Sequence, residues 1–171
     1  LEDFGPKGEI KPRKYPVSKM EVRAFEQDKD SDLRTKVVAA TYRKFVGSLN
    51  YLNTATRCDL SFVTQHLSTC LEKPTRTCLR IADCVLGYLK GTKDFELRID
   101  GRDGIPLLEA WSDADWAACV DTRRSVSGGW VTCGANRPTP VYWRSKKQPV
   151  VALSTAESEL IAATEVAREV V

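Results

Sequence analysis

The chain has 171 residues, 42% of them hydrophobic, and carries a formal net charge of +3 at pH 7. This length allows one domain or two small ones, and so small a charge does not by itself indicate a nucleic-acid partner. The sequence has no run of about 18 apolar residues, and its start, "LEDFGPKGEIKPRKYP", is not a signal peptide, so we expect neither a membrane segment nor secretion.

The six cysteines form neither a CxxC pair nor a zinc-finger spacing with a histidine. An even number permits disulfides, but a chain of this size can build a core without them, so we favour reduced thiols. We therefore expect an intracellular protein, cytoplasmic or nuclear. The cysteines are Cys58, Cys70, Cys78, Cys84, Cys119 and Cys133.

Residues 1–34 are rich in charge and contain Pro6, Pro12 and Pro16. No sustained hydrophobic periodicity runs through them. This composition predicts a linker, or an arm draped on a larger body.

Residues 35–94 predict three short helices that pack as a small bundle. We expect the second helix to begin at the N-cap Asp59, and the third to be capped by Thr75 and to stop before Gly91, its C′ residue. Nine basic and five acidic residues between positions 35 and 96 also hint at a basic surface. The expected apolar faces are Val38, Tyr42, Phe45, Val46, Leu49 and Leu52; Phe62, Val63, Leu67 and Leu71; and Cys78, Ile81, Ala82, Val85 and Leu89.

The pattern changes to short strands in residues 95–171 and returns to a helix at the end. Ser154 or Thr155 would cap this helix, whose periodic residues are Leu153, Ala156, Leu160, Ile161, Thr164 and Ala167. The fold class is therefore α+β, a helical bundle followed by an antiparallel meander and a helix. The expected strands are 95–99, 107–111, 128–134 and 141–147, with a turn at 100–104 and a loop at 135–140.

Two carboxylates of this second half could bind a divalent cation. Asp113 follows an expected strand, and Glu159 lies in the first turns of the terminal helix. Hard cations such as Mg²⁺ prefer carboxylate oxygens from a rigid frame. Turn formation and helix capping explain the same residues without a metal, and spacing alone favours those structural roles.

Several segments, in order along the chain, closely resemble the Pol polyprotein of copia-type LTR retrotransposons. They include "YRKFVGSLNYL", "TRCDLSFVTQHLS", "YLKGTKDFEL", "SDADWAACVDTRRSVSGGWV" and "YWRSKKQPVVALSTAESELIAA". The resemblance covers about Tyr42 to Ala163, which is most of the chain. It implies that residues 35–94 are the tail of a reverse transcriptase, with its thumb and connection, and that residues 95–171 begin a ribonuclease H domain.

The same resemblance implies a chemistry. Ribonuclease H-like domains hold two Mg²⁺ ions with four carboxylates and cut the RNA strand of an RNA–DNA hybrid. Asp113 matches the first ligand and Glu159 the second, with Glu157 as the alternative. Asp115 is expected to belong to the turn.

The other two ligands of the family lie downstream of the matching helix and have no counterpart in residues 1–171. The reverse transcriptase's own catalytic aspartates are also absent from these residues. We therefore expect a portion of a Pol polyprotein that does not cleave by itself. The alternatives are a non-catalytic nucleic-acid-binding or assembly module, and a decayed copy of the element.

Other residues allow a functional and a structural interpretation. Phosphate contact and ordinary surface exposure are equally expected for the cations Arg123, Arg124, Arg144, Lys146 and Lys147. For Trp116 and Trp143, core packing is favoured over base stacking. For His66, Ser125 and Ser127, we expect structural positions.

The resemblance further implies that a fourth strand, not contained in residues 1–171, pairs with the strand that ends at Trp111. We therefore expect this strand to have an open edge, which would pair with a second copy of the chain, be covered by the N-terminal arm or be prone to aggregation. The remainder of the Pol polyprotein is a further expected partner.

Overall fold

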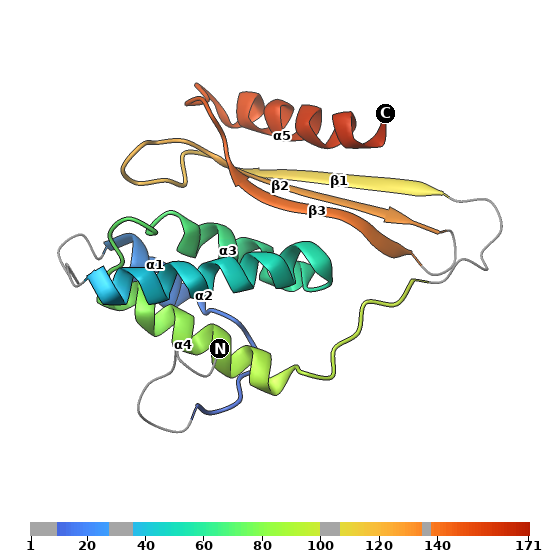
Figure 1. The fold of residues 1–171 in the computed structure, drawn as a ribbon. Helices are drawn as coiled ribbons and strands as arrows, with labels where there is room; N and C mark the ends of the chain where they lie inside the picture. The colour runs from blue at the N-terminus through green and yellow to red at the C-terminus, as the bar shows by residue number, and fades with distance from the viewer. Residues whose placement is uncertain (1–9, 28–35, 100–106, 135–137) are drawn as a thin grey trace. The chain divides into compact units, whose positions relative to one another are not determined.

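The computed structural model describes residues 10–27, 36–99, 107–134 and 138–171, and the chain divides into two compact units, Leu1–Phe95 and Glu96–Val171. The α+β class is confirmed (Figure 1). No helix in the described ranges is long and apolar enough to cross a bilayer. The elements are α1 Lys19–Gln27, α2 Lys36–Ala55, a 3₁₀ turn η1 Cys58–Leu60, α3 Ser61–Ser68, α4 Arg76–Gly91, β1 Leu108–Asp115, β2 Val126–Cys133, β3 Thr139–Lys147 and α5 Thr155–Val170.

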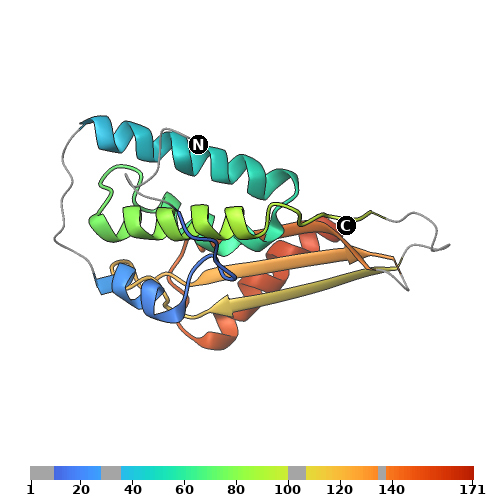
Figure 2. The same ribbon diagram turned by 90° about the horizontal axis from the view of Figure 1, so that it is seen from below.

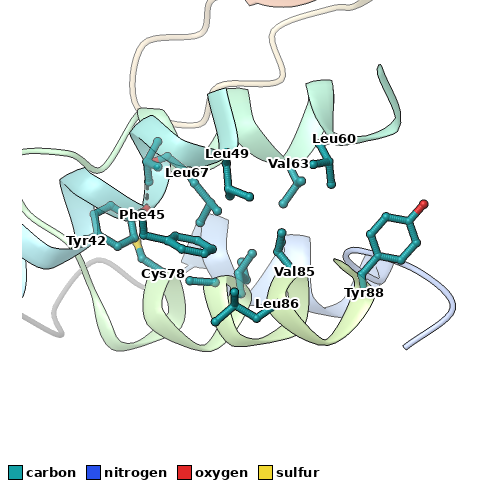
Figure 3. Packing of buried hydrophobic residues seen from close by; sticks show 13 residues of the cluster. Tyr42, Phe45, Leu49, Leu60, Val63, Leu67, Cys78, Val85, Leu86 and Tyr88 are labelled. Carbon is teal, nitrogen blue, oxygen red and sulfur yellow. Dashed lines mark hydrogen bonds between the residues drawn. The ribbon is translucent and has the colours of Figure 1, made fainter. Parts of the chain in front are cut away.

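The first unit, which we call the helical unit, has a continuous apolar core. The predicted faces of α2, α3 and α4 supply most of it (Figure 3). Phe62, which we also expected on this face, is 45% exposed. The buried hydroxyl of Tyr42 donates a 2.8 Å hydrogen bond to the Leu67 carbonyl. Thr75 caps α4 as predicted, accepting from the Cys78 amide. The core comprises Tyr42, Phe45, Val46, Leu49, Leu60, Val63, Leu67, Cys78, Ile81, Ala82, Val85, Leu86 and Tyr88.

Asp59 does not cap a helix, contrary to our expectation. Its carboxylate accepts from the Arg57 guanidinium at 2.8 Å and from the Tyr88 hydroxyl at 2.7 Å. Arg57 also donates to the Thr92 hydroxyl at 2.7 Å. The "TRCD" segment therefore ties the α2–α3 turn to the end of α4. The helix ends at Gly91 with Thr92 as its C-cap, so Gly91 is not the residue beyond the cap.

The segment expected to be a linker or arm contains α1, which the periodicity did not predict. Ser18 and Glu21 begin this helix as a reciprocal capping box: each backbone amide donates to the other residue's side chain. Lys11 and Arg13, which precede it, lie on α4. A Cβ at Gly87 or Gly91 would be 2.6 Å from their carbonyl oxygens, so this close approach requires glycine.

The second unit, which we call the sheet unit, is a three-stranded antiparallel sheet of order β1-β2-β3 with α5 on one face (Figures 1 and 2). The strands expected at 107–111, 128–134 and 141–147 are present with shifted ends. Residues 95–99 do not form a strand, and the expected turn at 100–104 lies outside the described residues. The loop expected at 135–140 is shorter, because β3 already begins at Thr139.

The buried face of α5 differs from the one that we expected. Ser154 is the N-cap, but Leu153 is 87% and Leu160 68% exposed. Small residues one turn apart, Ser158, Ala162 and Val166, face the sheet instead. They allow a close approach: a Cβ at Gly129 would be 2.8 Å from Val166. Residue size, rather than hydropathy, therefore decides which side of α5 is buried.

Candidate metal-binding site of the sheet unit

Asp113 lies within β1, because this strand continues to Asp115. Asp115 is therefore the last strand residue, paired with Val126, and does not belong to a turn as expected. Ser112 is opposite Gly129, which faces α5, so these two positions share the covered face of the sheet. Strand alternation then puts Asp113, which is exposed, on the opposite, open face.

The structure separates the two candidate glutamates by role. Glu157 forms the N-terminal box of α5: its amide donates to the Ser154 hydroxyl, and its carboxylate accepts from the Leu153 amide at 2.6 Å. Side-chain directions turn by about 100° per helical residue. Glu159 thus lies about 60° from the centre of the buried face, whereas Glu157 lies about 140° away.

Glu159 is on the flank of α5 that is nearer β1. The opposite flank carries Glu165, which lines a small cavity together with Tyr142 and Arg144 of β3. Helical geometry puts Glu159 and Glu165 about 60° to either side of the buried face. Since the Glu165 side faces β3, the Glu159 side faces β1, on which α5 also packs.

The buried side chain of Gln148 fixes the position of α5 along the strands of the sheet. The Gln148 side-chain amide, 1% exposed, donates to the Ser127 hydroxyl and to the Ser158 carbonyl, both at 2.9 Å. Ser127 pairs with Ala114, the neighbour of Asp113. The start of α5 therefore lies at the same level of β1 as Asp113, with Glu159 on the covered side of the strand and Asp113 on the open side.

Both carboxylates are available for a ligand. Within the described ranges, the side chains of Asp113 and Glu159 have neither a hydrogen bond nor an ion pair, and β1 pairs with β2 alone, so its other edge is open. The donor type fits Mg²⁺. The number of donors does not complete a site, because the described residues contain no group of three or more His, Cys, Asp or Glu that could hold a metal.

The candidate phosphate-contacting cations come from two elements, the β1–β2 loop and β3. Arg123 and Arg124 are exposed on the β1–β2 loop, where Arg123 has a positive φ of 55°. Arg144 and Lys146 are exposed on β3, at positions that share the covered face with Gly129 and Ser127. Lys147 is half-buried and donates to the Cys119 sulfur at 2.9 Å.

That contact affects the cysteine. Partial burial would raise the pKa of the Cys119 thiol, but hydrogen bonds from Lys147 and Thr122 outweigh it and lower the pKa to about 7.

The remaining candidates have structural positions. Ser125 and Ser127 are buried, and the Ser125 hydroxyl accepts from the Ala117 amide at 3.1 Å. His66 is half-buried, with the rings of Phe25 and Phe62 at 5.0 and 4.9 Å between centroids. These side chains are therefore engaged within the protein.

An aromatic row on the open face was not predicted. The ladder places Trp111 opposite Trp130, and Trp130 opposite Trp143, so the three side chains share the face that carries Asp113. Trp111 is 49% exposed, and the other two are half-buried. Trp116 is 43% exposed and donates to the Ala152 carbonyl, so it is not the core residue that we expected.

Known proteins similar to this chain include transposon polyproteins. The chain is 38% identical over 130 residues to the retrovirus-related Pol polyprotein from transposon TNT 1-94 of Nicotiana tabacum. The aligned residues are 76% of this chain and 9% of that protein. It is 40% identical over 118 residues to the Pol polyprotein from transposon RE2 of Arabidopsis thaliana, covering 69% of this chain and 8% of that protein.

A shorter protein from Plasmopara viticola, named secreted RxLR effector protein 161, is 39% identical over 130 residues, which are 76% of this chain and 89% of that protein. The chain thus spans less than a tenth of the two polyproteins but most of this shorter relative. No family model and no solved structure matches it.

Proposed function

The chain belongs to the retrovirus-related Pol polyproteins of copia-type LTR retrotransposons, and on that premise we propose that its sheet unit is the first half of a ribonuclease H domain. The parent activity is cleavage of the RNA strand of RNA–DNA hybrids during reverse transcription. The helical unit belongs, in this proposal, to the tail of the reverse transcriptase.

The observation that carries the proposal is that Asp113 of β1 and Glu159 of α5 lie at the same position along the β1 strand. The first is on the open side of the strand, the second is on the flank of α5 nearer to it, and both carboxylates are unpaired in the described structure. A metal at this edge of the sheet would lie where a further strand could pair with β1 and add ligands.

Asp113 and Glu159 would hold Mg²⁺, which, when bound, supplies Lewis acidity to a phosphodiester and its attacking water. The chain's own contribution is to hold the two carboxylates on rigid elements. Gln148 does this by tying α5 to β2. Because two ligands leave a cation under-coordinated, residues 1–171 alone are not expected to cleave.

The test is cleavage of a hybrid with a labelled RNA strand by residues 1–171 in Mg²⁺. We expect no cleavage above that of the Asp113→Asn variant. Turnover that Asp113→Asn abolishes and the matched control Asp115→Asn retains would overturn the expected inactivity, while supporting the assignment of Asp113.

Binding of nucleic acid without cleavage is the second candidate, and the exposure of Arg123, Arg124, Arg144 and Lys146 favours it. Affinity for a hybrid should then fall steeply with salt, because cations release counterions from the phosphates. Fluorescence anisotropy at several KCl concentrations measures this slope. Replacing the four cations by glutamine should flatten it, whereas Asp113→Asn should leave it unchanged. A slope that survives the fourfold change would exclude these residues.

A further inference from the structure

Cys119 and Lys147 bring a thiol and an amine into direct contact in the sheet unit. The Lys147 Nζ atom donates to the Cys119 Sγ atom at 2.9 Å. Cys119 lies on the β1–β2 loop, and Lys147 is the last residue of β3. Both side chains are half-buried, so the pair is packed against the protein but keeps some surface open to solvent.

Backbone hydrogen bonds hold both segments that carry the pair. The Cys119 amide donates to the Arg124 carbonyl at 3.1 Å, and the Arg123 amide donates to the Cys119 carbonyl at 2.7 Å. Next to Lys147, the Gln148 amide donates to the Ser125 carbonyl at 2.8 Å, which joins the end of β3 to the end of the same loop. The contact between sulfur and nitrogen therefore connects two backbone segments that are already fixed beside each other.

The same contact favours reaction at the sulfur. Burial would raise the pKa of the Cys119 thiol, but hydrogen bonds from Lys147 and Thr122 lower it to about 7, so roughly half of the thiol is ionised at neutral pH. The thiolate is the form that a peroxide oxidises. The amine that stabilises this thiolate becomes a nucleophile once it has given up a proton.

Two cysteines of the helical unit have oxygen atoms as neighbours instead. The Cys84 thiol donates to the Glu21 carboxylate at 3.2 Å, and the Cys78 sulfur lies 3.2 Å from the Thr75 hydroxyl. Neither contact provides an amine. Among the hydrogen bonds that the structure describes, the amine neighbour therefore distinguishes Cys119.

We propose that Cys119 and Lys147 form a modification site, at which a peroxide links the cysteine sulfur to the lysine nitrogen through a reversible sulfenamide bond. The bond would join the β1–β2 loop covalently to the end of β3 and would remove the positive charge of Lys147. This site is independent of the proposed nuclease function.

The reaction balances with hydrogen peroxide as the oxidant. The Cys119 thiolate attacks one peroxide oxygen, the S–O bond forms, and the O–O bond breaks. The departing hydroxide takes a proton from the Lys147 ammonium, which leaves a sulfenic acid, a neutral amine and one water. The amine nitrogen then attacks the sulfur, the S–N bond forms, the S–O bond breaks, and the departing hydroxide takes a proton from the same nitrogen. Thiolate, ammonium and one peroxide thus give one sulfenamide and two waters.

Peptide mapping of residues 1–171 tests the site. After hydrogen peroxide, free thiols are alkylated and the chain is digested with trypsin, which cuts after Lys146 but not after a Lys147 whose nitrogen is bonded to sulfur. Residues 103–123, which carry Cys119, should be recovered linked to residues 147–168, with a combined mass lower by two hydrogen atoms. Dithiothreitol should release both peptides.

Lys147→Arg keeps a positive charge beside the sulfur but removes the nucleophilic amine. The linked peptide should then fall at least about tenfold, and dimedone should trap Cys119 as its sulfenic acid. Lys146→Arg, at the adjacent exposed position, is the matched control and should retain the link. Circular dichroism checks that both variants fold, and Lys147→Gln replaces Lys147→Arg if the latter does not.

Two results would overturn the proposal. One is a Cys119 that, in the peroxide-treated wild type, is recovered only as the alkylated thiol, as an oxygen acid or in a disulfide. The other is a linked peptide that forms in the same yield in Lys147→Arg.

Discussion

The helical unit and the sheet unit have very different interiors. The helical unit buries large aliphatic and aromatic side chains from three helices in one cluster. In the sheet unit, the buried hydrophobic residues are the smaller Ala117, Val131, Ala152, Ala162 and Val166, alongside buried polar residues such as Gln148 and Ser158. The helical unit therefore has its own apolar core, whereas the sheet unit has one sheet face covered by α5, one open face and an open edge at β1.

The largest expected effect is in the helical core. Leu49→Ala removes a fully buried side chain from the centre of the cluster and should lower the free energy of unfolding by about 2–5 kcal/mol. Val131→Ala is the counterpart in the sheet unit and should cost about 1–2 kcal/mol, because fewer methyl groups are lost. Amide hydrogen exchange measures the stability of the two units separately. A larger loss of unfolding free energy in Val131→Ala than in Leu49→Ala would contradict the stated difference between the two interiors.

The hydrogen bonds between Arg57 and Asp59 in the helical unit should give the next largest effect on stability. Arg57→Met leaves the Asp59 carboxylate, whose side chain is 30% exposed, without its guanidinium and should cost about 1.5–3 kcal/mol, a typical value for hydrogen bonds to a charged group. Chemical denaturation measures this loss. Lys44→Met, at an exposed position on α2, is the control and should change little. Equal stability of the two variants would show that the tie is dispensable.

Acid should weaken the same unit. Burial would raise the pKa of Glu21 and of Asp59, but hydrogen bonds from Arg13 and Ser18 lower that of Glu21 to about 2, and those from Arg57 and Tyr88 lower that of Asp59. Both pKa values are depressed in the folded state, so this stabilisation is present above the unfolded values, roughly pH 4. It is lost as the pH falls toward 2.

The denaturation midpoint should therefore decrease as the pH falls from about 5 to about 2.5. Arg57→Met should make this dependence of the midpoint on pH less steep, because it removes the main partner of Asp59. A slope unchanged by Arg57→Met would contradict a pKa depressed by that contact.

Within the sheet unit, Gln148→Ala should cost about 1–2 kcal/mol, because the Ser158 carbonyl and the Ser127 hydroxyl lose a buried donor. Hydrogen exchange in α5 should rise more than exchange in the helical unit. Lys146→Ala, at an exposed position two residues earlier on β3, is the matched control and should leave α5 protected. If protection of α5 from hydrogen exchange is unchanged in Gln148→Ala, Gln148 does not fix the position of α5, and with it Glu159, along β1.

The smallest effect separates the two glutamates. Glu157→Gln replaces a capping carboxylate with a weaker acceptor and should cost roughly 0.5 kcal/mol. Glu159→Gln should leave thermal stability unchanged, because the Glu159 carboxylate has no hydrogen bond within the described residues. Thermal unfolding followed by circular dichroism measures both. A stability loss in Glu159→Gln alone would show that the structural role belongs to Glu159 instead.

The same contrast explains what the sequence could predict. Periodicity found α2, α3 and α4 because large apolar residues recur there at helical spacing. It missed the buried side of α5, because the residues that face the sheet, Ser158, Ala162 and Val166, are small, and a Cβ at Gly129 would be only 2.8 Å from Val166. It also missed α1, which is only nine residues long and begins with a capping box.

The candidate site was predicted only in part. The motifs predicted Asp113 and Glu159. The sheet face on which Asp113 lies and the position of α5 along β1 follow only from the register of β1 with β2. The row formed by Trp111, Trp130 and Trp143 depends on two registers, that of β1 with β2 and that of β2 with β3, and no local pattern encodes either.

In our proposal, Asp113 and Glu159 are two ligands of one incomplete cation site. Mn²⁺ can replace Mg²⁺ at oxygen ligands, and it broadens the amide NMR signals of nearby residues. We predict that signals around Asp113 and around Glu159 broaden over the same range of Mn²⁺ concentration, and that Asp113→Asn removes both effects whereas Asp115→Asn removes neither. Broadening confined to one carboxylate, or centred on Asp115 and Glu157, would contradict the claim.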